Sequence, residues 1–249
     1  METTLALDAG NTVLTWGLFV GDRLDRVGSF PNAAERWEAP FDWSEVDRVA
    51  LASVRHETDE RIRREWPDAP STVRLGRERP IPVKTHVPHP EQVGADRLVN
   101  CLAWNRRSRI EPSKSRATPA VIVDFGTAIT FDVVGADGAY LGGLILPGSR
   151  LVAGALSRET SLLPEVPIEA TPELFGRDTV ACIRRGVYGL FRGGVEFHLS
   201  QLREQLPAET VFVATGGSAP TFAPWFDSIE LVLPYLTLEG IRWAEELSR

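Results

Sequence analysis

Residues Val121 to Val134 are VIVDFGTAITFDVV, and this stretch decides the fold. An apolar run ends at Asp124, a short Phe125-Gly126-Thr127 corner follows, and a second β-rich run starts at Ala128. Strand-forming residues on both sides of a glycine-containing corner predict a β-hairpin. The turn of this hairpin carries a carboxylate and a hydroxyl group.

The N-terminus repeats the same arrangement. Leu5 to Asp8 form an apolar run that ends in a carboxylate, Ala9-Gly10-Asn11-Thr12 form the corner, and Val13 to Val20 form the second β-rich run. The two corners lie more than a hundred residues apart. The repetition therefore predicts two similar half-molecules that face one ligand.

Both corners carry groups that suit a phosphate ligand. Glycine lets the backbone approach an anion, and threonine hydroxyls donate hydrogen bonds. A carboxylate repels phosphate, so Asp8 and Asp124 fit beside phosphates only if a cation or its waters lie between. The alternative is that both corners are plain hairpin turns, because Asp, Asn and Gly are common turn residues. The repeated order of Asp, Gly and Thr favours the nucleotide-binding interpretation, since turn geometry does not require it.

Composition sets the class of protein. The 249 residues are 43% hydrophobic and 24% charged, as in a globular protein, and suffice for two lobes of roughly 110 to 130 residues. A formal net charge of -7 argues against a nucleic-acid partner. Without an apolar run of about 18 residues, we expect no membrane partner and a cytoplasmic location. Cys101 and Cys182 are expected to be reduced, small hydrophobic residues of helices.

Hydrophobic patterning predicts an α/β protein with an N-terminal lobe over 1–115 and a C-terminal lobe over 116–249. The polar stretch 106–118 is the expected linker, and the final helix is expected to pack back across both lobes. The expected strands are Val46–Val54 and Val211–Ala214, and the expected helices are Thr58–Trp66, a helix from near Asp96, Ser149–Glu159, Thr179–Leu202 and Leu236–Ala244.

The helix that starts near Asp96 follows the sequence Gly94-Ala95-Asp96-Arg97. As a structural residue, Asp96 would be a plain N-cap. A carboxylate followed at once by arginine also suits catalysis, because the carboxylate accepts a substrate hydroxyl proton while the guanidinium binds an oxyanion. Both interpretations remain open from these residues alone.

From end to end, the sequence resembles the type III pantothenate kinases. The motifs that carry the resemblance are DAGNT at Asp8, PEQVGADRLVN at Pro90, DFGTAITFDVV at Asp124, YLGGLILPG at Tyr140, GRDTVACIRRGVYG at Gly176, ATGG at Ala214 and LTLEG at Leu236. The resemblance implies two duplicated ribonuclease-H-like lobes of the acetate and sugar kinase/Hsp70/actin superfamily, with the nucleotide cleft between them. It also implies transfer of the γ-phosphoryl group of ATP to the primary hydroxyl of pantothenate, the first step of coenzyme A synthesis.

The resemblance also implies roles for individual residues. Asp96 would be the catalytic base, with an ordinary pKa of about 3.9. Asp124 would hold a monovalent cation, K⁺ or NH₄⁺, and Mg²⁺ would arrive with ATP. Gly94, Ala95, Asp96, Arg97 and Thr179 would contact pantothenate in a homodimer whose subunit interface completes the site. Thr127 would contact ATP, and the phosphate-binding loop would consist of Asp8, Ala9, Gly10, Asn11, Thr12, Val13, Leu14 and Thr15. The four histidines form no metal-ligand pattern and receive no role.

One position departs from the family pattern. Seven residues before Gly94, where the family often has a substrate-contacting tyrosine, this chain has Val87. A same-fold kinase for another small alcohol, such as a sugar, or for a carboxylate therefore stays open as an alternative. A non-catalytic nucleotide-binding regulator is the other alternative, which the presence of Asp96 and the acidic composition disfavour.

Overall fold

The computed structural model describes residues 2–53, 57–108 and 117–248. The chain forms two compact units. Unit 1 consists of Met1–Thr118, Asp132–Gly142 and Tyr235–Arg249, and unit 2 consists of Pro119–Phe131 and Gly143–Pro234. The chain has two five-stranded sheets, and unit 1 also includes the residues 132–142 that join the strands of the second sheet.

The first sheet has the strand order β3-β2-β1-β4-β5. Its strands are β1 (Thr3–Ala9), β2 (Val13–Val20), β3 (Arg23–Pro31), β4 (Arg48–Ser53) and β5 (Thr72–Arg74). β2 is antiparallel to both β1 and β3, β4 is parallel to β1, and β5 is parallel to β4. The predicted N-terminal hairpin is confirmed, and the predicted strand 46–54 corresponds to β4, which begins at Arg48. β3 was not predicted, because half-exposed charged residues interrupt its apolar pattern.

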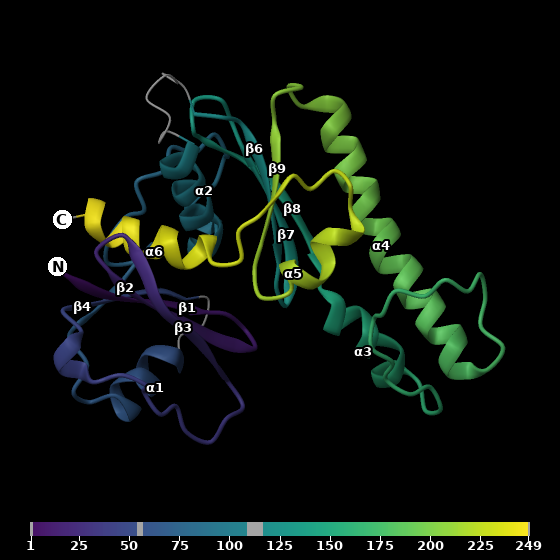
Figure 1. Cartoon of the computed structure of the whole chain (residues 1–249), viewed down its shortest axis with the longest axis horizontal. Helices are drawn as coiled ribbons and strands as arrows, with labels where there is room; N and C mark the ends of the chain where they lie inside the picture. The colour runs from purple at the N-terminus through teal and green to yellow at the C-terminus, as the bar shows by residue number, and fades with distance from the viewer. Residues whose placement is uncertain (1, 54–56, 109–116, 249) are drawn as a thin grey trace. The chain divides into compact units, whose positions relative to one another are not determined.

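Alternation along β1 gives the first sheet two buried faces, as expected for a strand period of two. Leu5 and Leu7 belong to the core on the side of α1 (Glu57–Glu65). Ala6 belongs to the opposite core, with α2 (Ala95–Ser108) and α6 (Leu236–Leu247). Figure 1 shows α1 on one side of the sheet and α2 with α6 on the other. This layering holds the β1–β2 corner on a rigid central strand.

The core under α1 is aromatic. Neighbouring rings of Trp16, Phe30, Trp37, Phe41, Trp43 and Trp66 have centroids 5.0 to 6.4 Å apart. The segment between β3 and β4 supplies three of these rings and contains the 3₁₀ turn η1 (Trp43–Glu45). Because that segment has neither a helical nor a strand period, its burial was not predictable from patterning.

Helices α2 and α6 pack closely on each other. A Cβ on Gly240 of α6 would overlap the Val99 carbonyl of α2, so glycine permits the close approach. Near the other end of α2, the Arg107 guanidinium donates to both carboxylate oxygens of Glu239, at 2.6 and 2.5 Å. The final helix thus belongs to the framework that supports α2.

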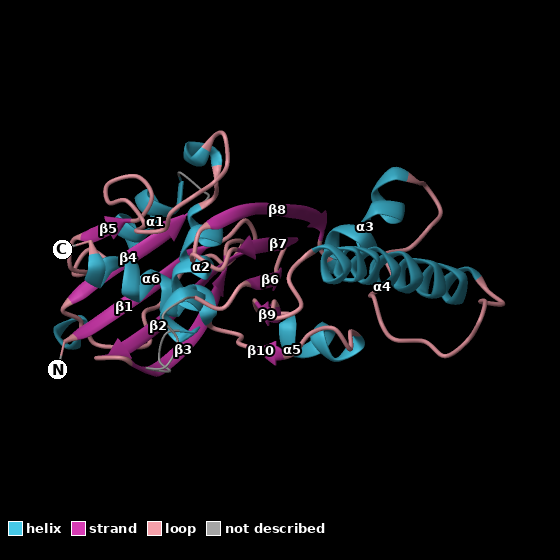
Figure 2. Cartoon of the chain, turned by 90° about the horizontal axis from the view of Figure 1, so that it is seen from above, coloured by secondary structure: helices cyan, strands magenta, loops and turns pink. Residues whose placement is uncertain are grey.

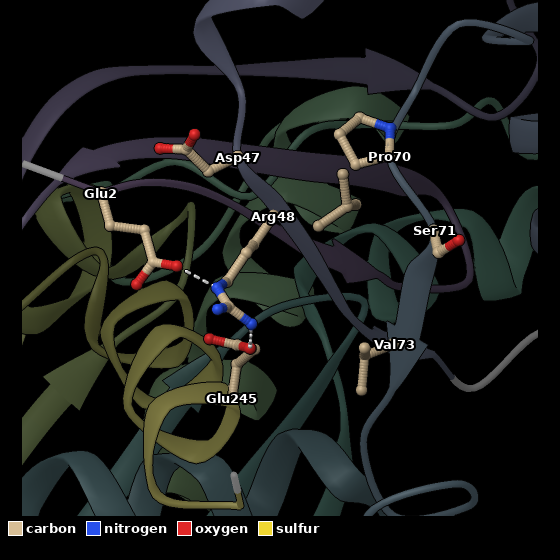
Figure 3. Close-up of a pocket in the computed structure, with 8 residues that line it drawn as sticks. Glu2, Asp47, Arg48, Pro70, Ser71, Val73 and Glu245 are labelled. Atoms are coloured by element: carbon tan, nitrogen blue, oxygen red, sulfur yellow. Dashed lines mark hydrogen bonds and ion pairs between the residues drawn. The ribbon is translucent and has the colours of Figure 1, made fainter.

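A charged pocket of about 750 Å³ lies at the junction of β4, β5 and α6 (Figure 3). There the Arg48 guanidinium lies between the carboxylates of Glu2 and Glu245, and Nη1 of Arg48 is 3.3 Å from Oε1 of the buried Glu245. Arg79 Nη1 is 3.9 Å from the same Glu245 oxygen. These ion pairs link α6 to the first sheet.

The second sheet repeats the topology of the first. Its strands are β6 (Ala120–Phe125), β7 (Ala128–Val134), β8 (Tyr140–Pro147), β9 (Val211–Thr215) and β10 (Leu231–Val232), in the order β10-β9-β6-β7-β8. A two-residue connection joins β6 to β7, so these neighbours are antiparallel. β9 is parallel to β6 and to β10. Counted from β8, the order matches that of the first sheet, which confirms the predicted α/β fold of duplicated ribonuclease-H-like lobes.

Unit 2 carries the remaining helices α3 (Ser149–Glu159), α4 (Thr179–Gln205) and α5 (Ala219–Phe222), followed by η3 (Ala223–Trp225). α3 lies beside the first turns of α4 (Figure 2), and the two share a small core that includes Ile183 and Val187. Phe191 of α4 contacts Phe222 of α5, with ring centroids 4.8 Å apart.

Several sequence predictions can be compared with these elements. The five predicted helices correspond to α1, α2, α3, α4 and α6, and the predicted strand Val211–Ala214 corresponds to β9. The predicted linker 106–118 and the boundary at residue 115 fall largely or wholly on residues 109–116, outside the described ranges. Both cysteines are free and lie in helices, as expected; Cys101 is buried in α2 and Cys182 is exposed on α4.

In the part of the chain that the structure describes, every helix lacks either the length or the apolar character needed to cross a membrane.

Candidate functional site

The first corner joins β1 to β2 through Gly10, Asn11 and Thr12. Asp8 is half-buried near the end of the central strand, opposite Thr15 of β2 and Ala52 of β4 in the sheet register. The Gly10 amide donates to the Val13 carbonyl at 3.1 Å and closes the turn. The N–H group of Gly10 is therefore used inside the turn, so only the missing side chain of this glycine could serve a ligand.

A brace from β3 and α1 holds this corner. The backbone N–H of Asn32 donates to the Thr12 carbonyl and its side-chain amide donates to the Gly10 carbonyl, both at 2.9 Å. The Arg61 guanidinium donates to the Asn32 carbonyl at 2.7 Å and stacks 3.9 Å above the Trp37 ring. Sequence reasoning missed this brace, because its members are distant in sequence and none belongs to a recognised motif.

The second corner joins β6 to β7 through Gly126 and Thr127. Its geometry mirrors the first, since the Gly126 amide donates to the Ala128 carbonyl at 3.1 Å. Asp124 is half-buried near the end of the central strand, opposite Thr215 of the parallel strand β9. Each of the two sequence-predicted aspartates therefore occupies the same position in its own sheet.

Two further glycines lie against the second corner. Gly216 follows β9 with a φ of +90°, and a Cβ there would lie closer than 3.0 Å to Oδ1 of Asp124 and 3.0 Å from the backbone N and O of Phe125. Gly148 follows β8, and its amide donates to the Thr127 carbonyl at 3.1 Å. Close backbone approach at both glycines defines the space around Asp124 and Thr127.

Asp96 lies in the first turn of α2. The helix starts at Ala95, where the Gly94 carbonyl accepts from the Leu98 amide at 3.3 Å. Asp96 is the second residue of the helix, and its carboxylate accepts from the neighbouring Arg97 amide at 2.9 Å, so the plain N-cap interpretation is wrong. Burial raises the pKa of Asp96, although the Arg97 amide and guanidinium oppose this shift. The pKa is therefore above the ordinary value assumed from the sequence.

Arg97 turns toward a buried carboxylate on β7. Its Nε donates to Oδ1 of Asp132 at 2.6 Å, and the Asp132 side chain is completely buried. The guanidinium lies 5.5 Å from the centroid of the Tyr140 ring. Burial, followed by the Asp132 charge, raises the pKa of Tyr140 to about 12, so its hydroxyl stays protonated at neutral pH. The motif that starts at Asp124 contains Asp132, which receives no role from the sequence alone. A carboxylate inside the apolar run Phe131–Val134 was the signal that could have identified it.

Val87 lies next to these residues in unit 1. The chain before α2 pairs with the start of β8, since the Tyr140 amide donates to the Lys84 carbonyl and the His86 amide donates to the Tyr140 carbonyl. The Cγ1 atom of Val87 is 3.9 Å from the position that a Cβ on Gly142 would occupy. An aliphatic side chain there offers no hydrogen bond.

Thr179 is the first residue of α4 and is exposed. The preceding Asp178 caps the helix by accepting from the Ala181 amide at 2.8 Å. Thr179 also lines an apolar groove of about 900 Å³ between α3 and α4, whose walls include Leu151, Leu156 and Leu190. The structure describes Thr179 and Asp96 in different units.

In the described ranges 2–53, 57–108 and 117–248, no group of three or more His, Cys, Asp or Glu side chains could hold a metal ion. A cation at Asp8 or Asp124 would therefore take most of its ligands from backbone, hydroxyl, substrate or water oxygens.

The duplicated sheets and the paired aspartate corners define the class of protein. The chain has the fold of the acetate and sugar kinase/Hsp70/actin superfamily. Over 98% of both chains it is similar to a Baf family protein from Campylobacter jejuni, with a TM-score of 0.59 and 19% identity. It is also similar to component A of (R)-2-hydroxyglutaryl-CoA dehydratase from Acidaminococcus fermentans over 100% of this chain and 98% of that one, with a TM-score of 0.54 and 13% identity.

Sequence comparison identifies the family within this class. The family model for type III pantothenate kinase matches residues 4–201. The type III pantothenate kinase of Moorella thermoacetica is 33% identical over 256 residues, which cover 96% of each chain. The chain belongs to the type III pantothenate kinase family.

Proposed function

We propose that the protein transfers the γ-phosphoryl group of ATP to the primary hydroxyl of pantothenate, the first step of coenzyme A synthesis. The observation that carries this proposal is a partly buried carboxylate of raised pKa, Asp96, at the start of α2 in a chain of this family. Phosphoryl transfer depends mainly on positioning and charge neutralisation, so no tuned histidine is required.

Asp96 would accept the proton of the attacking hydroxyl late in the transfer. Its raised pKa favours this role, because a base works best when its pKa approaches the working pH. Arg97 would bind an oxyanion of the substrates, and Gly94 and Ala95 would line the pantothenate pocket. Arg97 is suited to this because its charge is permanent and its guanidinium is held by Asp132.

ATP would bind at both corners. The phosphate-binding loop would run from Asp8 to Thr15, with Thr127 as a further contact. The residues fit, because each corner combines a glycine, threonine hydroxyls and a half-buried carboxylate that a cation can separate from phosphate. Mg²⁺ would neutralise phosphate charge, and the Asp8 carboxylate would contact the ion directly or through bound waters.

Asp124 would hold the monovalent cation, K⁺ or NH₄⁺. A half-buried carboxylate with the Gly216 backbone against it offers oxygen ligands to an ion. The cation would offset negative charge near the phosphates. We propose this role from the local chemistry of the corner and from family membership.

A homodimer would complete the pantothenate site, with Thr179 as a substrate contact. Gly186, Leu190, Gly193 and Phe197 are spaced at intervals of 4, 3 and 4 residues and so lie on one face of α4. Leu190 and Phe197 are 69% and 60% exposed, and a Cβ on Gly186 or Gly193 would meet nothing within 4 Å. This apolar face, hereafter the α4 stripe, would let a second helix approach closely.

We also propose a division into lobes and a cellular location. The lobes would divide near residue 115, and the final helix would support both. The protein would act in the cytoplasm, without nucleic-acid or membrane partners.

The test is coupled ADP release with pantothenate, with and without K⁺ or NH₄⁺. We expect turnover to require pantothenate and a monovalent cation. Asp96→Asn should lower kcat by at least about 10²-fold, and near-normal turnover in this variant would exclude Asp96 as the base. Asp124→Ala should abolish the response to the cation; an unchanged response would remove that role.

Val87 favours one second candidate, a kinase of the same fold for another small alcohol. The missing hydroxyl leaves a substrate group without the partner that a tyrosine gives it. Turnover of a panel of small alcohols, with none for pantothenate, would establish this alternative.

A further inference from the structure

We propose that Asp132 is the positioning residue that fixes the Arg97 guanidinium beside Asp96, and that its carboxylate is required for productive binding of the alcohol substrate. The inference rests on the proposed function, because it assigns a support to a residue of that site. Asp132 does not itself touch the substrate.

The first argument is geometric. Asp132 lies on β7, 35 residues beyond Arg97, and its Oδ1 receives the Arg97 Nε–H at 2.6 Å. Nε is the inner nitrogen of the guanidinium, so a bond at this atom fixes the plane of the whole group. The Tyr140 ring, 5.5 Å from the guanidinium carbon, limits movement on another side. The two contacts restrict the rotation of a side chain that otherwise has many rotamers.

The second argument concerns burial. The Asp132 side chain has no exposed surface and the Arg97 side chain retains 13%. A buried carboxylate is costly unless a cation and hydrogen bonds compensate it. A fully buried ion pair is weak evidence for stability, because apolar residues of similar volume often serve at least as well. The placement of this pair next to Asp96 therefore points to a role in holding Arg97 in position.

The third argument compares this pair with another ion pair on the same helix. Arg107, near the other end of α2, pairs with Glu239 of α6 through two hydrogen bonds. The Arg107 and Glu239 side chains keep 38% and 17% of their surface exposed, and they link two helices. That pair has an evident structural purpose, so Glu239→Gln is a matched control, with the same change of charge on a partner of α2.

The experiment is a double-mutant cycle with Asp132→Asn and Arg97→Met in the full-length protein, read by steady-state kinetics and by thermal unfolding. Asp132→Asn should raise KM for pantothenate about tenfold or more and leave KM for ATP within about twofold. In the Arg97→Met background, Asp132→Asn should change kcat/KM by less than about twofold, because its effect passes through Arg97. Glu239→Gln should leave both KM values unchanged.

Unfolding provides an independent readout. Arg97→Met leaves a buried carboxylate without its guanidinium partner, so it should lower Tm, and the double variant should recover part of that loss. If wild type shows no turnover with pantothenate, the proposed function fails. The positioning role can still be tested then, because it would be overturned if the effects of Arg97→Met and Asp132→Asn on Tm were simply additive. A KM for pantothenate in Asp132→Asn equal to that of wild type, despite a lower Tm, would also overturn the proposal. If Asp132→Asn does not fold, the double variant is compared with Arg97→Met, and a further tenfold loss of kcat/KM would refute the proposal.

Discussion

Gly216→Ala gives the sharpest test of the second corner. At φ +90°, a residue with a Cβ is strained, at a cost of roughly 1–3 kcal/mol. The new methyl group would also overlap Oδ1 of Asp124 and lie 3.0 Å from the backbone N and O of Phe125. The carboxylate can rotate, but the two backbone atoms can move only with the strand, and such overpacking costs about 1–3 kcal/mol. The free energy of unfolding should therefore fall by roughly 2–6 kcal/mol.

The chain supplies a matched control one residue away. A Cβ on Gly217 would meet nothing within 4 Å, and the φ of Gly217 is not positive. Gly217→Ala should change the unfolding free energy by less than about 1 kcal/mol, because the restriction of the unfolded chain offsets small losses in the folded state. Chemical denaturation of both variants and wild type measures the difference. For a loss of about 3 kcal/mol, the Gly216→Ala Tm should fall by roughly 6–12 °C.

Activity separates the two consequences of Gly216→Ala. Because the methyl group displaces the Asp124 carboxylate, the folded variant should respond less to K⁺ or NH₄⁺ even at temperatures well below its Tm. If Gly216→Ala and Gly217→Ala had equal stability and an equal cation response, the close approach of Gly216 to Asp124 would contribute neither to the free energy of unfolding nor to the cation response.

Three further predictions concern the other functional elements. Asp96→Asn should raise Tm at pH 7 while it lowers kcat, because burial raises the folded-state pKa of Asp96 and its ionisation therefore costs stability as pH rises through that value. The gain in Tm should vanish below pH about 4, and a lower Tm of the variant at pH 7 would contradict the burial effect. Leu190→Glu should convert a dimer to monomers in light scattering, whereas Arg192→Gln, with the same change of charge on another face of α4, should not; a dimeric Leu190→Glu would exclude the α4 stripe as the interface. Asn32→Ala should cost about 1 kcal/mol of stability and raise KM for ATP, measured by denaturation and initial rates, and an unchanged KM would separate the brace from nucleotide binding.

Local patterns were sufficient to predict much of the fold. The hairpins at both corners follow from apolar runs around glycine, and the helices α1, α3 and α4 follow from periodicity with capping residues such as Asp178. The repetition of Asp8 and Asp124 predicted the duplicated sheets, because equal corners need equal strand frameworks. β3 and the buried ring of Trp37 were not predictable, since tertiary packing decided them without a local period.

Sequence motifs predict candidate ligand-facing residues but not the side chains that support them. Motifs identified Asp96 and Arg97, but Asp132 pairs with Arg97 across 35 residues, and a pairing of this kind leaves no periodic signal. The same holds for Asn32, whose side chain supports Gly10 from the turn after β3. Such partners are determined by the register of the sheet and the placement of helices, and these follow only after the chain has folded.

The three carboxylates of the proposed site illustrate why these supports matter. Asp8 lies in a strand that two neighbours hold in register, Asp124 lies against the backbone of Gly216, and Asp96 precedes an arginine that a buried carboxylate holds. Transfer of a phosphoryl group depends on the placement of charge more than on covalent chemistry, so an error of about 1 Å in any of these positions is costly. Selection for activity should therefore act on Gly216, Asn32 and Asp132 as strongly as on the residues that touch substrate. Replacing each of them should then impair catalysis by more than its loss of stability explains.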